Sequence, residues 1–177
     1  MKICSMAIQN VSVQFFTKPH IKAYLHNNFG QKPAIDRTSI FHNFLILCLA
    51  HDLHRGMKDV PDYPDEMRLY ISKDDYERFG CWMNPRQMQL FNQHIDFFMK
   101  SVLVAHADTY LLHKPRALLK DALVYSLEQL KVTDDEWNIE TVTRYYHRSR
   151  IARSKFLMYQ KENSKKPLEI LSDYKNN

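Results

Sequence analysis

Arginine and lysine residues are concentrated near the C-terminal end of the sequence, from Thr141 to Lys166. This stretch contains eight of them against a single acid, Glu162, so it carries a net charge of +7. The whole chain carries +5, which leaves −2 for all the other residues together. A nearly neutral body with one strongly basic segment is typical of a protein that binds a polyanion, most often nucleic acid. Arginine strengthens this interpretation, since its planar guanidinium group can bind a phosphate or a guanine edge through two parallel hydrogen bonds.

The basic residues lie on a predicted amphipathic helix, Asn138 to Lys166. At about 100° per residue, its apolar side chains fall in one broad sector, which we expect to pack against the rest of the protein. That sector contains Val142, Tyr145, Tyr146, Ala152, Phe156 and Tyr159. The other side holds the residues that we expect to contact phosphates or base edges, namely Arg144, His147, Arg148, Arg150 and Lys155. Arg153 departs from the pattern, because it projects close to the apolar sector.

A second group of residues could support hydrolytic chemistry. His51 and Asp52 are adjacent at the end of an apolar helical stretch, and they resemble the metal-binding pair of HD-type phosphohydrolases. Such a site binds a divalent metal through imidazole and carboxylate groups and hydrolyses phosphate esters. It also needs an upstream histidine (His20, His26 or His42) and a downstream aspartate (Asp96 or Asp108). The simpler interpretation is a polar helix end, where histidine is favourable beside the negative pole of the helix dipole. We therefore expect no metal and no other cofactor.

Composition excludes several other classes of protein. The chain has only three glycines, and neither GxGxxG, GxxxxGK[ST] nor GxSxG occurs, so nucleotide-binding loops and acyl-transfer sites lack support. Cys4, Cys48 and Cys81 are odd in number and far apart, which argues against a disulfide framework or a zinc site and favours a reducing, intracellular setting. No apolar run approaches the roughly 20 residues that span a bilayer. We expect a soluble, cytoplasmic protein without membrane association.

The elements that position these residues are predicted to be mainly α-helical, in one domain over residues 1–166 with a polar tail at 167–177. Alternating apolar residues predict short strands at Val11–Phe16 and Met67–Ser72. Between them, a helix follows Thr17 as N-cap and ends at Gly30, and a second helix runs from Asp36 to near Gly56. A helical turn over residues 74–79 ends at Gly80.

Two further helices are predicted before the basic one. Asn84, Pro85 and Gln87 form a strong start signal, with a capping box, for a long helix. Its apolar stripe is expected at Phe91, His94, Phe98, Val102, Ala105, Thr109 and Leu112. The next helix is predicted to start at Pro115 and to end near Leu130.

A short connection precedes the basic helix. Thr133 to Glu136 match the capping-box pattern, and Asn138 can cap the final helix. The segment from Ala122 to Arg150 resembles the helix-turn-helix of small DNA-binding regulatory proteins carried by phages and other mobile elements. The resemblance implies a DNA-binding part at residues 115–160, with Thr141, Arg144, Tyr145 and Arg148 in or near DNA-facing positions. Lys131 to Thr133 stand where the turn of that family usually has a glycine.

These patterns predict a non-enzymatic protein that binds double-stranded DNA, such as a transcriptional or replication regulator of a mobile element, with homo-oligomerisation left open. Two alternatives also stay open. One is a metal-dependent HD-like phosphohydrolase, and the other is a helical interaction module whose basic face binds an acidic protein.

Overall fold

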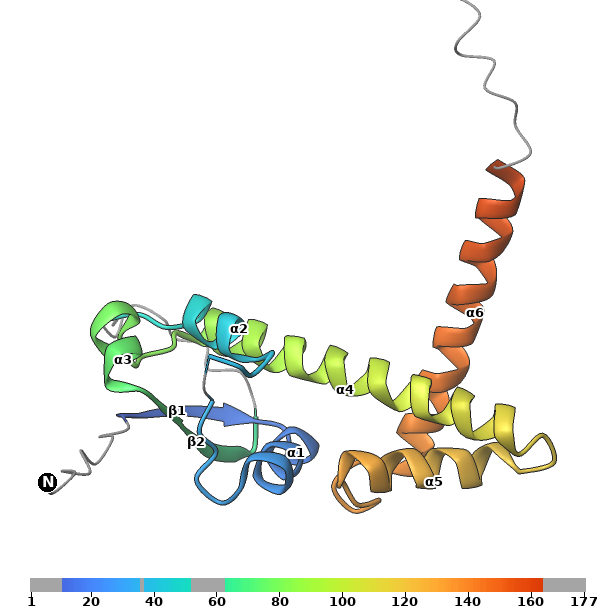
Figure 1. The fold of residues 1–177 in the computed structure, drawn as a ribbon, viewed down its shortest axis with the longest axis horizontal. Coiled ribbons are helices and arrows are strands. Elements are labelled where there is room, and N and C mark those ends of the chain that lie inside the picture. Colours follow the sequence, from blue (N-terminus) through green and yellow to red (C-terminus); the bar gives the residue numbers. More distant parts are fainter. Residues whose placement is uncertain (1–10, 36, 52–62, 164–177) are drawn as a thin grey trace, which may run out of the picture. The chain divides into compact units, whose positions relative to one another are not determined.

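The computed structural model of the chain describes residues 11–35, 37–51 and 63–163 (Figure 1). It is mainly helical with two short strands, as expected, and the strands pair in one small antiparallel sheet. The chain divides into two compact units between Ile139 and Glu140. The first unit holds β1 (Val11–Thr17), α1 (Pro19–Phe29), α2 (His42–Leu47), β2 (Asp65–Ile71), α3 (Lys73–Phe79), α4 (Pro85–His113) and α5 (Leu119–Leu130). The second contains nearly all of α6 (Ile139–Asn163).

The two strands confirm the alternation seen in the sequence. β1 and β2 pair antiparallel, with Val11 opposite Ile71 and Thr17 opposite Asp65. Every second residue points to the same face of the sheet, and on that face Val13 and Phe15 are buried. The ring of Phe15 packs edge-on against Phe91 of α4, with 5.4 Å between ring centres. The sheet therefore rests on the long helix through its apolar face.

The start of α1 differs from the prediction. Lys18, rather than Thr17, is the N-cap residue, and no side chain caps this end of the helix. Thr17 is the last residue of β1, and its side chain points to the buried face. There its hydroxyl donates a hydrogen bond to the Oδ1 atom of Asn92 on α4. Because the register of β1 points the Thr17 side chain toward α4, this side chain is not available to cap α1.

The predicted helix from Asp36 to near Gly56 is wrong in extent. α2 has only six residues and is followed by Cys48, while the two predicted ends lie outside the described residues. Two residues beyond Cys48, Ala50 forms a bridge with Trp82 through hydrogen bonds of 2.8 and 3.1 Å. Gly80 lies so close to the Ala50 carbonyl that a Cβ atom would be 2.1 Å from its oxygen. Pairing with a distant segment thus requires extended backbone where the sequence suggested helix.

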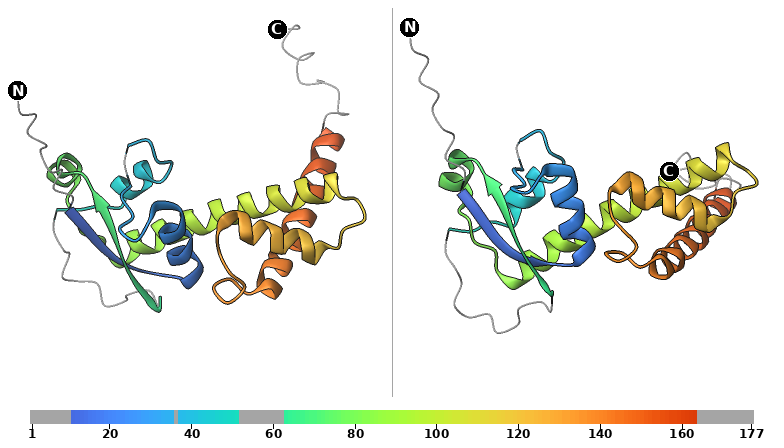
Figure 2. Two further views of the ribbon diagram at one scale, coloured as in Figure 1. Left: turned by 60° about the horizontal axis from the view of Figure 1, so that its bottom comes forward. Right: turned by 90° about the horizontal axis from the view of Figure 1, so that it is seen from below.

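α4 begins as predicted, with a full capping box between Asn84 and Gln87, but the predicted apolar stripe is wrong. Of the predicted stripe residues only Phe91 is buried, and Ala105, Thr109 and Leu112 are exposed. The buried residues are Met88, Phe91, Asn92, Ile95, Asp96, Met99, Leu103, Val104 and Ala107. This face packs on the sheet and α1 at its N-terminal half and on α5 at its C-terminal half (Figure 2). Polar Asn92 and Asp96 belong to it, which is why hydropathy alone misplaced the stripe.

α5 begins at Leu119 rather than at Pro115, which lies in the preceding turn. The Asp121 carboxylate accepts a hydrogen bond from the Leu118 backbone N–H at this start. At the other end Lys131 adopts the left-handed conformation, with φ of 56°, that glycine usually supplies after a helix. A helix end of the expected kind therefore forms without the missing glycine. Because α5 and α6 belong to different compact units, the helix-turn-helix arrangement stays a prediction.

Candidate nucleic-acid interface

The segment before α6 is held by local hydrogen bonds. The Glu136 carboxylate accepts from the backbone N–H of Thr133 at 2.8 Å, as the capping-box pattern predicted. The N–H of Trp137 donates to the Thr133 carbonyl at 3.0 Å, which closes one helical turn. Asp134 then accepts from the N–H of Ile139, the first residue of α6. A carboxylate at this position is favourable, because it faces the positive pole of the helix dipole.

α6 buries little of its predicted apolar sector. Val142 and Tyr146 are buried and Tyr145 is half-buried. Phe156 and Tyr159 are 58% and 65% exposed, so the expectation that they pack on the body is wrong. Ala152 is exposed as well. The sequence pattern shows which residues share a side of the helix, but it does not show how far along the helix that side is covered.

Most of the residues predicted to contact nucleic acid are accessible. The exposed ones are Thr141, Arg144, His147, Arg148, Arg150 and Lys155, and Tyr145 is half-buried. Arg144 forms an exposed ion pair with Glu140 at 3.4 Å, and the Arg150 guanidinium lies 5.8 Å from the centre of the Tyr146 ring. Arg148 and Lys155 form no ion pair with any residue in the described part of the chain.

The exposed cations occupy two sides of α6. Arg144, Arg148 and Lys155 lie within about 40° of one another around the helix axis. Arg153 lies on roughly the opposite side, and so does Arg150, so the prediction that Arg150 shares a side with Arg144, Arg148 and Lys155 is wrong; both arginines are exposed. At 1.5 Å per residue, the first group extends over about 16 Å of helix. A helix lying in a DNA groove has a phosphate backbone on each side, so two opposite rows of cations suit that placement better than one row.

The residues of the alternative metal site are not brought together. The Nε2 atom of exposed His51 lies 3.2 Å from the carbonyl oxygen of Arg78, and Asp52 lies outside the described residues. Two of the candidate further ligands, His20 and Asp96, contact each other, and a third, His42, contacts Asp75, but none of these contacts includes His51. Among the residues that the structure describes, no group of three or more histidine, cysteine, aspartate or glutamate side chains could hold a metal ion.

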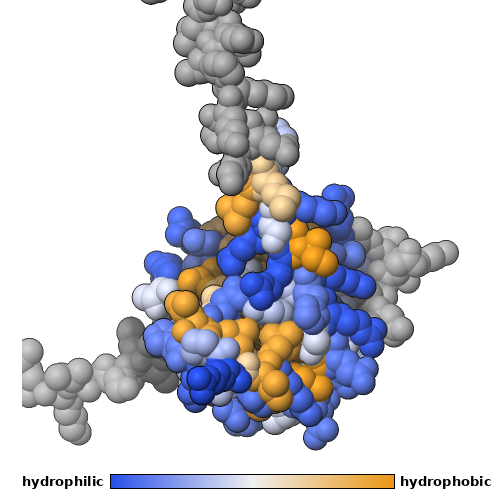
Figure 3. Space-filling view, turned by 90° about the vertical axis from the view of Figure 1, so that its right-hand side faces the viewer, coloured by the Kyte–Doolittle hydropathy of each residue, from blue (hydrophilic) through white to orange (hydrophobic). Residues whose placement is uncertain are grey.

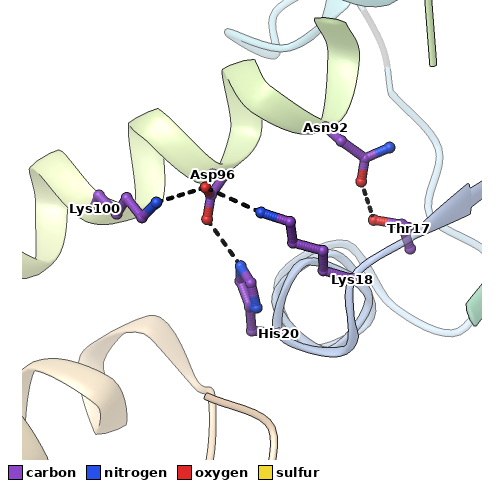
Figure 4. Close-up of polar contacts among 6 residues, drawn as sticks. All are labelled: Thr17, Lys18, His20, Asn92, Asp96 and Lys100. Atoms are coloured by element: carbon purple, nitrogen blue, oxygen red, sulfur yellow. Dashed lines mark hydrogen bonds and ion pairs between the residues drawn. The ribbon is translucent and has the colours of Figure 1, made fainter. Parts of the chain in front are cut away.

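Asp96 is instead the centre of a buried ionic cluster (Figure 4). Its carboxylate contacts Nε2 of His20 at 2.9 Å, Nζ of Lys100 at 2.7 Å and Nζ of Lys18 at 3.4 Å. Burial alone would raise the pKa of Asp96, but hydrogen bonds from His20 and Lys100 and the charges of the lysines hold it well below its usual range. His20 also stacks on Trp137, with ring centres 4.7 Å apart. The cluster joins the start of α1, α4 and the segment before α6.

Sequence analysis identified His20 and Asp96 only as possible metal ligands and missed the lysines. The pair of Asp96 and Lys100 could have been found, since an acid four residues before a lysine on a helix is a known stabilising spacing. Lys18 and His20 are more than 70 residues away along the chain. Their contact with Asp96 depends on the tertiary fold, and no local signal indicates it.

Comparisons with protein families, with curated proteins and with solved structures found no match to this chain. None of the described helices combines the length and the apolar character that crossing a membrane requires.

Proposed function

We propose that this protein binds double-stranded DNA through α6 and acts as a non-enzymatic regulator. One observation supports the proposal above the others. Between Ile139 and Tyr159, α6 has five arginine and lysine residues against one acid, Glu140, and all five are exposed. Those cations lie on two opposite sides of the helix.

Stability of the fold does not account for this charge. Exposed ion pairs contribute about 0–1 kcal/mol, so the exposed pair of Arg144 with Glu140 adds little to stability. Arg144 and Arg148 are four residues apart, a spacing at which like charges destabilise a helix by a few tenths of a kcal/mol. A polyanion would relieve this repulsion, and binding it would release the counterions condensed on the nucleic acid.

The dimensions of α6 favour duplex DNA over duplex RNA. The major groove of B-form DNA is about 12 Å wide and admits an α-helix with its side chains. The major groove of A-form RNA is deep and too narrow for side chains to read. An exposed helix with cations on both sides therefore fits B-form DNA, with guanidinium groups reaching phosphates and base edges.

A salt titration with a charge-matched control tests this function. Duplex binding is measured by fluorescence anisotropy at several salt concentrations for the native protein and for Arg148→Ala/Lys155→Ala. The control, Arg68→Ala/Lys73→Ala, removes the same charge from exposed residues of β2 and α3. We expect the log–log salt slope of the α6 variant to shrink by about 0.9 for each phosphate that it no longer neutralises, with the slope of the control unchanged. No binding at low salt, or equally weakened binding in the two variants, would reject the proposal.

An acidic protein partner is the competing function, and a specific feature favours it. Four consecutive apolar residues, Phe156 to Tyr159, are 58–65% exposed. Figure 3 shows that apolar surface is interspersed with hydrophilic surface on the face that it draws. A protein interface would bury such side chains at its centre, where aromatic residues dominate the binding energy. Phosphate contacts do not require them. In the anisotropy assay, Phe156→Ala should therefore leave DNA affinity nearly unchanged if DNA is the partner.

A further inference from the structure

A small pocket lies between α1, the start of β2 and the segment before α6. Its volume is about 330 Å³, within the lower range of small-molecule sites. One side of α1 forms its floor, with Pro19, Ala23, His26 and Asn27 spaced four, three and one residues apart. Ala23 is small and lies in the middle of this stripe, so it leaves space that a larger residue would fill.

Two contacts hold the walls of the pocket in place. Toward the C-terminal end of α1, the Asn27 side-chain amide donates to the Lys131 carbonyl at 2.7 Å, and Nζ of Lys131 donates back to the Asn27 carbonyl at 3.3 Å. Toward the N-terminal end, His20 stacks on Trp137. About seven residues separate these α1 positions, or about 10 Å along the helix. The segment that carries Glu136 is thus fixed on both sides of the pocket.

The lining of the pocket contains two carboxylates, Asp65 and Glu136, but one lysine, Lys22. Lys22 pairs with Asp65 at 3.6 Å, which compensates both of those groups. Glu136 is half-buried and also lines the pocket, yet it forms no ion pair with any residue in the described part of the chain. Its Oε2 atom accepts one backbone hydrogen bond, from Thr133, and its other oxygen has none there. A bound cation would give this carboxylate the ionic partner that it lacks in the described part of the chain.

The neighbouring groups also offer acceptors. The side-chain nitrogen of Asn27 is used by Lys131, so the Oδ1 atom is the end of that amide left for a ligand. The imidazole of His26 lines the same space and can accept through one ring nitrogen when neutral. An ammonium group has three N–H donors, which is the number of acceptors that Glu136, Asn27 and His26 supply.

We propose that this pocket binds a small organic ammonium compound, with its cationic nitrogen on Glu136. The proposal is independent of DNA binding by α6, because all its residues belong to the first compact unit and the test uses no nucleic acid. Lys22 also lines the pocket, and although it pairs with Asp65 its ammonium group has further N–H donors, one of which can contact the carboxylate of an α-amino acid. The shared chemistry is therefore the ammonium group, and the test separates a simple amine from an amino acid.

The test uses the full chain and two small probes at pH 8. Backbone amide NMR shifts of residues 22–31 and 133–137 are followed while n-butylammonium is added, with 1-butanol as the uncharged analogue. We expect saturating shifts with n-butylammonium at concentrations on the order of millimolar and none with 1-butanol. Norleucine, an α-amino acid, is then titrated in the same way. Tighter binding of norleucine than of n-butylammonium indicates an amino-acid ligand, and weaker binding indicates a simple amine.

Two variants make the result decisive. Glu136→Gln removes the charge but keeps an oxygen for the Thr133 N–H, so the thermal midpoint should stay nearly constant while affinity for n-butylammonium falls at least about tenfold. The same exchange at exposed Glu128 on α5, Glu128→Gln, should leave the affinity unchanged. Absence of saturating shifts, equal binding of 1-butanol, or undiminished affinity in Glu136→Gln would overturn the proposal.

Discussion

The helices α4 and α6 are similar in length, at 29 and 25 residues, but they use their polar side chains in opposite ways. On α4, Asn92 and Asp96 are buried and bonded to residues of β1 and α1. On α6, the arginines and Lys155 are exposed, and of the residues whose burial is described only Val142 and Tyr146 are buried. The difference indicates that polar side chains of α4 help to specify the fold, whereas most described side chains of α6 are accessible to solvent.

A phenylalanine on each helix tests this difference between α4 and α6, and we expect the largest effect on the free energy of unfolding here. Phe91 on α4 is fully buried against Phe15, whereas Phe156 on α6 is 58% exposed. Phe91→Ala should lower the free energy of unfolding by about 3–5 kcal/mol, because it gives up the transfer energy of the ring and leaves a cavity. Phe156→Ala should change it by less than about 0.5 kcal/mol. Urea unfolding measures the change in the free energy of unfolding for both variants, provided that the m-value is the same as in the native protein. A large loss of stability for Phe156→Ala would mean that this part of α6 is covered in solution.

A matched pair of acids gives the next largest effect. Asp96→Asn leaves Lys18, Lys100 and His20 without their carboxylate, so we expect the free energy of unfolding to fall by about 3 kcal/mol near neutral pH. Glu140→Gln removes the acid of an ion pair whose side chains are 69% and 76% exposed, and should cost less than about 0.5 kcal/mol. Thermal and urea unfolding of the two variants test this difference. Equal costs would contradict the assignment of Asp96 as a structural centre.

Local sequence signals predicted the parts of the fold that local chemistry determines. The alternation around Val13 marks a strand because one face of a sheet is buried, and Asn84 with Gln87 marks the start of α4 because the capping box is complete within four residues. The exposure of Arg144 and Arg148 on α6 was also predicted, since both lie on the side of the helix away from Val142. Each of these signals is contained in a short stretch of sequence.

Features set by distant contacts could not be predicted in this way. The length of α2 depends on pairing between Ala50 and Trp82, and the buried face of α4 depends on partners for Asn92 and Asp96 that lie more than 70 residues away. The pocket at Glu136 is a similar case, because it exists only where α1 meets the segment before α6. The capping-box pattern correctly predicted the hydrogen bond from the Thr133 N–H to Glu136. It did not predict that the Glu136 carboxylate would line a pocket without an ion-pair partner in the described part of the chain.

The smallest expected effect is a pH dependence that originates on α4. The pKa of Asp96 is lowered in the folded protein by His20, Lys100 and Lys18, whereas an aspartate in the unfolded chain has a pKa of about 3.9. A lowered folded pKa gives stability that is fully present above the unfolded value and is lost as the pH falls toward the folded value. The stability difference between the native protein and Asp96→Asn should therefore narrow as the pH falls from about 5 to about 3, at up to about 1.4 kcal/mol per pH unit. Urea midpoints of both proteins across this range measure the difference, and effects of other groups common to both proteins, including the lowered pKa of Asp75, largely cancel. A difference that stays constant down to pH 3 would show that the charge of Asp96 does not stabilise the packing of α1 on α4, and α4 would then depend on its apolar contacts and on the hydrogen bonds of Asn92.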